Sequence, residues 1–202
     1  MSFSLYEACV GYQYFFFLNM FCWKRKDNPI KRRNDVCLLW IARKNSKSIN
    51  SWLIMILLML LEPKYSEFYL CVNTRDQAKI IYNEAKKLLE SSPIIKDKFD
   101  IKRDVITCRL NQNTLKALSS DANTLDGRRV SAACIDELGA AKDGYLIESM
   151  TSGMLSVQNR LLILISTSYP NTQNPFLGGL ITVRKLLMMW LMMKSSLTCF
   201  IA

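Results

Sequence analysis

Between residues 36 and 167 the chain alternates short apolar runs with longer amphipathic stretches, and this alternation constrains its fold more than any other feature. Four of the apolar runs have the length of strands and turn-like flanks. Such an order predicts a layered α/β domain around a largely parallel, buried sheet. The predicted strands cover residues 36–42, 67–72, 130–135 and 161–166.

Three of the intervening stretches have the spacing of helices. Apolar residues recur at helical intervals from Ala78 to Leu89, Asn73 and Thr74 precede this stretch as candidate caps, and Pro93 follows it. Because a proline disfavours helix at the residue before it, the helix should end near this point. The predicted helices cover residues 47–61, 75–90 and 144–154.

The composition narrows the classes of function. The chain has 27 Lys and Arg against 17 Asp and Glu, and this charge of +10 suits a polyanionic partner such as DNA or a phospholipid surface. It has no histidine and no C-x-x-C pair among its seven cysteines, which excludes zinc fingers and His-dependent triads. We expect reduced, mostly buried thiols in a cytoplasm. The apolar run 52–61 is too short to span a bilayer, so it predicts a core helix and no membrane partner.

The first candidate site is the turn 42–48, which leaves a predicted strand and enters a predicted helix. Backbone N–H groups at a helix start face an anion, Lys47 can reach the β- and γ-phosphates of a nucleotide, and the Ser48 hydroxyl can hold Mg²⁺. Neither glycine of the pattern G-x-x-x-x-G-K-[ST] is present, since Ile41 and Ser46 occupy those positions. An ordinary loop before a helix is the alternative interpretation of this turn.

The second candidate site is the acidic pair Asp136 and Glu137, which follows the apolar run 130–135. At the carboxyl edge of a parallel sheet, Asp136 could bind magnesium and Glu137 could orient or deprotonate an attacking water. Two adjacent carboxylates after a buried strand are costly unless a metal or a hydrogen-bond donor compensates them. A solvated helix cap is the alternative.

The third candidate site is the tip of the last predicted strand, where Ser166 and Thr167 follow an apolar run. Hydroxyls at such a tip can sense the γ-phosphate of a nucleotide, although Ser and Thr are also ordinary turn formers. The order of phosphate turn, acidic strand end and hydroxyl strand end favours a nucleotide site.

These residues resemble the motifs of one family, the large terminase subunits of tailed phages. The likeness extends over roughly residues 10–180 with the motifs in family order. It implies an α/β P-loop NTPase with a mostly parallel central sheet flanked by helices and an extra catalytic-Glu strand. The segments that carry the likeness are 41–48, 74–78, 121–127, 135–138 and 165–167.

The resemblance also implies a role for each site residue. Arg43 would act near the γ-phosphate and Glu137 would be the catalytic acid, while Ser48 and Asp136 would hold Mg²⁺. Ser166 and Thr167 would form the coupling motif. The family usually has glycine at the position of Ser46, and serine would weaken nucleotide binding if that position needs positive φ. ATP would be bound by Ala42, Arg43, Lys44, Asn45, Ser46, Lys47 and Ser48, with Gln13 on the adenine side.

The resemblance divides the chain into an adenine-side segment (1–34), an ATPase core (35–176) and an aberrant tail (177–202). Met and Trp have single codons, and the Met- and Trp-rich stretch 187–194 gives acidic residues when its codons are read two bases later. We therefore expect a frameshift near residues 178–181. The family continues into a nuclease domain with clustered acidic metal ligands, whereas no Asp or Glu follows Phe176. We expect no DNA cleavage by this chain.

The function implied is the ATP-hydrolysing motor part of a phage large terminase, which powers packaging of double-stranded DNA into a procapsid in the host bacterial cytoplasm. The implied partners are DNA, a portal protein and a small terminase subunit, with the chain in a homo-oligomeric ring. An inactive truncated prophage remnant and a helicase-like nucleic-acid ATPase are the alternatives. Six basic residues would contact phosphates without reading sequence, unless they form only a solvated loop. They are Lys24, Arg25, Lys26, Lys31, Arg32 and Arg33.

Overall fold

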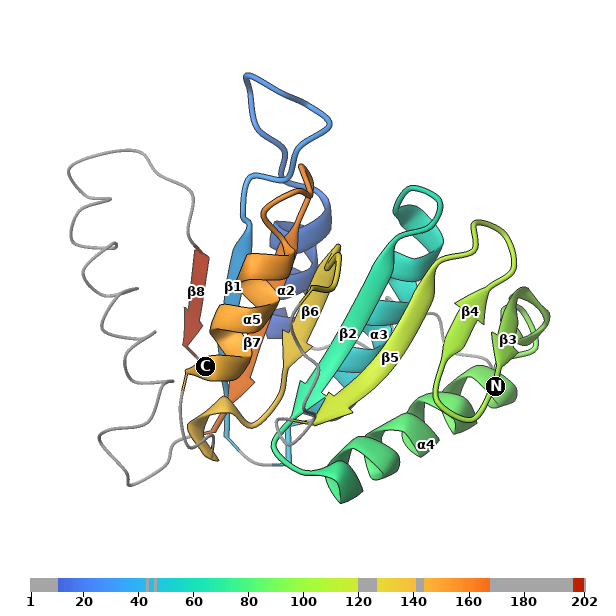
Figure 1. Ribbon diagram of the computed structural model, residues 1–202. Coiled ribbons are helices and arrows are strands. Elements are labelled where there is room, and N and C mark those ends of the chain that lie inside the picture. Colours follow the sequence, from blue (N-terminus) through green and yellow to red (C-terminus); the bar gives the residue numbers. More distant parts are fainter. Residues whose placement is uncertain are drawn as a thin grey trace.

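The computed structural model describes residues 11–42, 44–45, 47–119, 127–140, 144–167 and 198–201. Their strands form one eight-stranded sheet in the order β3-β4-β5-β2-β6-β7-β1-β8 (Figure 1). All pairings from β5 to β8 are parallel, and only β3 and β4 run antiparallel to their neighbours. The strands are β1 (Val36–Trp40), β2 (Glu67–Val72), β3 (Phe99–Ile101), β4 (Ile106–Cys108), β5 (Thr114–Ser119), β6 (Ala132–Ile135), β7 (Leu161–Ser166) and β8 (Thr198–Ile201).

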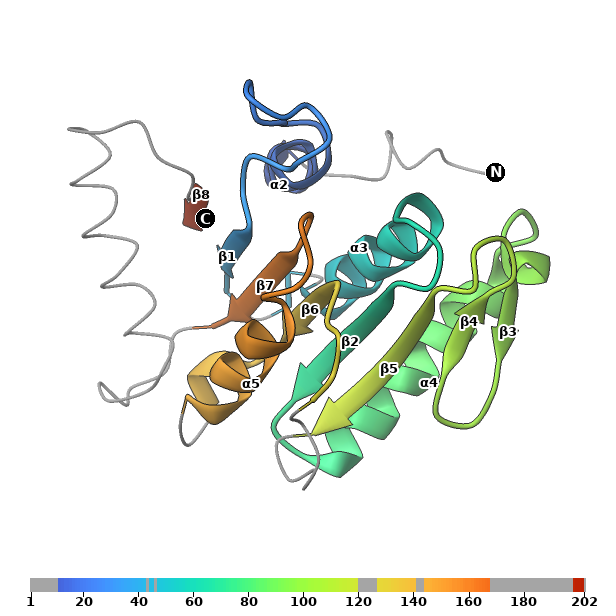
Figure 2. The ribbon, with the colours of Figure 1, turned by 45° about the horizontal axis from the view of Figure 1, so that its top comes forward.

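Helices cover both faces of the sheet (Figure 2). One apolar cluster joins α2, α3 and α4 to one face, and a second joins α5 to the other. Neighbouring strand residues contribute to opposite clusters, as Leu38 and Leu39 do, because side chains alternate along a strand. The helices are α2 (Gly11–Phe21), α3 (Lys47–Leu61), α4 (Arg75–Ser91) and α5 (Tyr145–Gly153), with short 3₁₀ turns η1 (Lys96–Lys98) and η2 (Leu138–Ala140).

The apolar helix α3 lies in the core, as its sequence predicts. Eight of its residues are buried, among them Trp52, Met55 and Leu58. No helix in the described ranges has the length and apolarity needed to cross a membrane. The expected buried thiols are also confirmed: Cys37 and Cys71 are fully buried, and burial raises the pKa of each to about 12. These thiols therefore stay protonated and unreactive near neutral pH.

Two parts of the fold differ from the sequence prediction. The sheet contains a further parallel strand, β5, between β2 and the β3–β4 hairpin. Residues 11–21, for which the sequence predicted no element, form α2. Of the tail predicted to be aberrant, residues 177–197 and 202 lie outside the described residues, while 198–201 pair with β1 as β8. The frameshift therefore stays a prediction.

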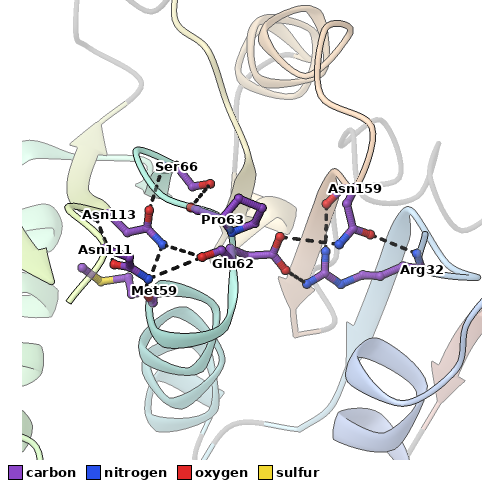
Figure 3. A network of polar contacts seen from close by, with 8 residues as sticks. All are labelled: Arg32, Met59, Glu62, Pro63, Ser66, Asn111, Asn113 and Asn159. Atoms are coloured by element: carbon purple, nitrogen blue, oxygen red, sulfur yellow. Dashed lines mark hydrogen bonds and ion pairs between the residues drawn. The ribbon is translucent and has the colours of Figure 1, made fainter. Parts of the chain in front are cut away.

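A buried polar network fixes the amino-terminal side of the sheet (Figure 3). Arg32, before β1, forms an ion pair with Glu62 at the end of α3, and the two side chains are only 3% and 9% exposed. Arg32 also donates from Nη1 to the carbonyl of Asn159, before β7, at 2.8 Å. Asn111 and Asn113 donate to the Met59 carbonyl at 2.7 and 3.0 Å, which satisfies the C-terminal end of α3. Breaking such a buried pair typically costs about 3–5 kcal/mol, so this network holds α3 in place.

Candidate active site

The parallel pairing brings the ends of three strands to one edge of the sheet. β7 lies between β1 and β6, with Trp40 opposite Ser166 and Ile135 opposite Leu164. The chain leaves β1 at this edge and enters α3 at Lys47. The phosphate turn, the acidic pair and the hydroxyl tip, far apart in sequence, are thus brought together at the carboxyl edge.

Asp136 is the most buried charged group of this edge, with 3% of its surface exposed. Its backbone N–H donates to the Cys71 carbonyl at 2.9 Å, and its Oδ1 accepts from the Glu137 N–H at 2.8 Å. Burial raises the pKa of the Asp136 carboxyl, and the Glu137 N–H, the charge of Lys47 and a hydrogen bond from Ser48 act in the opposite direction. The carboxylate therefore faces the first two residues of α3.

Ser48 and Asp136 are oxygen donors of the kind that magnesium prefers. Mg²⁺ commonly binds one or two protein oxygens and takes its other ligands from substrate phosphates and water. The described residues contain no group of three His, Cys, Asp or Glu that could hold a metal ion. The donor set therefore fits magnesium that is held jointly with phosphates, and it does not form a closed protein cage.

Glu137 has an unusual backbone, with φ of 54°. A non-glycine residue in the left-handed region is uncommon, and such conformations concentrate at functional sites. Asn73, after β2, donates to the Glu137 carbonyl at 3.0 Å and supports this conformation. The half-buried carboxylate thus leaves the end of β6 in a direction set by its neighbours.

Gln77 holds the carboxylate of Glu137 and is a residue whose individual role the sequence analysis missed. Its Nε2 donates to Glu137 Oε2 at 3.1 Å, while its Oε1 accepts from the Thr74 N–H at 3.2 Å. Thr74 is the N-cap of α4, as predicted, and the pair forms a capping box. The pattern T-x-x-Q before an amphipathic helix was the available signal, since it places the Gln77 amide at the start of α4.

The turn after β1 contacts α2. Tyr12 donates to the Asn45 carbonyl at 2.8 Å, and Gln13 Nε2 donates to Asn50 Oδ1 at 2.7 Å. Gln13 therefore reaches the first turns of α3, while its contact with adenine stays a prediction. Lys44 has φ of 69°, so the turn contains a left-handed residue, although not at a glycine. Arg43 and Ser46 lie outside the described residues.

The hydroxyl tip of β7 is buried. Ser166 is fully buried and donates from Oγ to the Thr167 carbonyl at 3.0 Å. Thr167 is 4% exposed, and its Oγ1 has no hydrogen-bond partner among the described residues. A buried hydroxyl without a partner typically costs about 1–3 kcal/mol, so this group is available to a ligand.

The fold and this edge define a class of protein. A helix that starts after one parallel strand, an acidic pair at the end of a second strand and a third strand between the two form a P-loop NTPase with the additional central strand. The α/β P-loop fold predicted from the sequence is confirmed.

Comparison with known proteins gives the family. Residues 11–176 match the family model described as terminase large subunit, ATPase domain. The chain belongs to this family. No curated protein sequence matches it significantly.

Solved structures agree with this assignment. The crystal structure of the bacteriophage HK97 large terminase superposes with a TM-score of 0.77 at 25% identity, over 89% of this chain and 37% of that one. The large terminase of a thermophilic bacteriophage gives 0.62 at 14% identity, over 91% and 44%. The ATPase domain of the large terminase of a Thermus phage, P74-26, gives 0.56 at 16%, over 77% and 70%. The last two share only the fold, and this chain spans little more than a third of the HK97 protein.

The burial of Asp136 predicts a pH-dependent stability. Between the ordinary carboxyl pKa of 3.8 and the raised pKa, the folded chain binds more protons than the unfolded chain, so stability falls as pH rises through this window. Without nucleotide and magnesium, we expect Asp136→Asn to raise the midpoint of thermal unfolding at pH 7. The gain should shrink as pH falls below the raised pKa. Asp97→Asn, at an exposed carboxylate, is the control, and a lower midpoint for Asp136→Asn at pH 7 would contradict the account.

Proposed function

We propose that this chain hydrolyses ATP with magnesium and is the motor part of a phage large terminase. One observation carries the proposal. The buried Asp136 carboxylate faces Lys47 and Ser48 at the start of α3, and Glu137 beside it is held by Gln77. This is a cation, an oxygen pair for magnesium and a positioned base within one edge of a parallel sheet.

Each residue has a chemical task in this proposal. Lys47 and the N–H groups at the start of α3 compensate the charge of the β- and γ-phosphates. Ser48 and Asp136 hold magnesium, which when bound neutralises charge on the phosphate oxygens. Glu137 orients the attacking water and accepts its proton.

The remaining roles rest on family membership. Arg43 acts near the γ-phosphate, Gln13 lies toward the adenine, and Ser166 and Thr167 respond to loss of the γ-phosphate. The unpartnered Thr167 hydroxyl supports the last role, because a ligand or a shifted neighbour could satisfy it.

The proposed partners follow from the same membership. The motor drives double-stranded DNA into a procapsid as a ring on the portal protein, with a small terminase subunit that selects the DNA. Because Glu137, Gln77 and Asp136 keep a complete set of contacts, we favour an active motor over an inactive remnant. The absence of nuclease activity stays a prediction.

The central test of hydrolysis is Glu137→Gln. This change keeps the shape of the side chain and removes the base, so we expect kcat for magnesium-dependent ATP hydrolysis to fall by roughly 10²–10⁴-fold. Glu148→Gln, at an exposed carboxylate on α5, should retain parent activity. Unchanged turnover in Glu137→Gln would exclude Glu137 as the base.

The role of Gln77 can be separated from its role as a cap. A hydrogen bond to a charged group contributes about 1.5–3 kcal/mol, so Gln77→Ala should lower kcat by about tenfold or more and leave KM for ATP nearly unchanged. Thr74→Ala removes the other half of the capping box but does not touch Glu137. Equal losses of kcat in the two variants would show that Gln77 acts only through helix stability.

A further inference from the structure

A large basic pocket lies at the edge of the sheet opposite the candidate active site. In Figure 1 the strand arrows point away from this edge, and the loops 22–35, 62–66 and 154–160 gather there. The pocket has a volume of about 1000 Å³ and lies between these loops and the segment before β6. We call it the amino-edge pocket. Its basic lining residues are Lys24, Lys31, Arg32, Lys64 and Arg129.

The charge of the amino-edge pocket is largely uncompensated. Glu62 is the single acidic residue among those that line it, and it forms the buried ion pair with Arg32. In the part of the chain that the structure describes, Lys24, Lys31, Lys64 and Arg129 form no ion pair. Four cations from separate segments therefore converge on one hollow without a counter-charge.

The floor of the pocket is rigid and contains an unused donor (Figure 3). The Arg32 side chain is 3% exposed and is fixed by Glu62 and Asn159. Its Nε has no hydrogen-bond partner among the described residues. A buried guanidinium N–H without an acceptor is costly, so this donor favours an anionic oxygen in the pocket.

The basic surface continues beyond the pocket. A second hollow of about 420 Å³ shares Arg129 and Ser156 with it and adds Arg128, Ser149 and Ser152. Arginine and hydroxyl groups are the side chains that most often contact phosphate oxygens of nucleic acids. A single small anion needs one or two such groups, whereas cations spread over two adjoining hollows match a chain of phosphates.

We infer that the amino-edge pocket and the adjoining hollow bind the phosphate backbone of double-stranded DNA. The inference rests on the proposed function and gives the DNA a location in this chain. It also relates the two sites, because α3 starts at Lys47 and Ser48 in the active site and ends beside Glu62 in the pocket floor. With 15 residues, α3 separates the two sites by about 22 Å.

The test is the salt dependence of binding to a fluorescently labelled duplex. The triple variant Lys24→Ala, Lys31→Ala, Lys64→Ala should bind at least about tenfold more weakly than the parent, and its slope of log affinity against log salt should be smaller by about 1 for each lysine. The matched control is Lys87→Ala, Lys96→Ala, Lys98→Ala, which removes the same charge from exposed lysines on α4 and η1. It should keep the parent slope.

The outcomes separate the inference from the proposed function. Basal magnesium-dependent ATP hydrolysis without DNA should be the same in the triple variant and the parent. Equal duplex binding by the triple variant and its control, or no duplex binding by the parent, would overturn the inference even if the parent hydrolyses ATP. Lysine-dependent duplex binding by a parent without ATP hydrolysis would support the inference and overturn the proposed function. Arg129→Ala, on another segment, should lower the slope by about 1 and provides the test if the triple variant does not fold.

Discussion

The parallel pairing of β7 with both β1 and β6 is the constraint on which the rest of the molecule depends. Because Trp40 lies opposite Ser166 and Ile135 opposite Leu164, three strands end at nearly the same level. A shift of one residue in this register would turn each buried side chain to the other face of the sheet. The two apolar clusters therefore fix the register, and the register in turn places the phosphate turn, the acidic pair and the hydroxyl tip together.

The candidate active site carries several local costs that the remaining structure supports. Asp136 is a buried carboxylate with a raised pKa, Glu137 has positive φ, and the Thr167 hydroxyl has no partner in the described chain. Each feature is unfavourable without a ligand, and all three lie at one sheet edge. Costs that gather in this way are typical of a functional site. The opposite edge is rigid because the Arg32–Glu62 pair and its asparagine neighbours fix the end of α3.

Much of the fold could be predicted because its central strands are apolar on both faces. The runs that became β1, β6 and β7 are buried almost throughout, and such runs are recognisable without knowledge of their partners. β5 was missed because it is half-exposed and contains Lys116, so its sequence resembles a polar connection. α2 was missed because its aromatic residues give no clear helical period. The Arg32–Asn159 contact joins positions 127 residues apart, and no local pattern can predict it. The Gln77 contact with Glu137 depends on the packing of two sheet ends, although the capping box itself was visible in the sequence.

The most direct test of the account is calorimetric titration of the chain with a non-hydrolysable ATP analogue, with magnesium and with a chelator. The account predicts one site per chain that requires magnesium, and Lys47→Ala should weaken binding by roughly 10–100-fold, because a charge-assisted hydrogen bond contributes about 1.5–3 kcal/mol. Lys87→Ala, at an exposed position on α4, should bind like the parent. Binding that is indifferent both to magnesium and to Lys47→Ala would contradict the claim that this edge of the sheet is a nucleotide site.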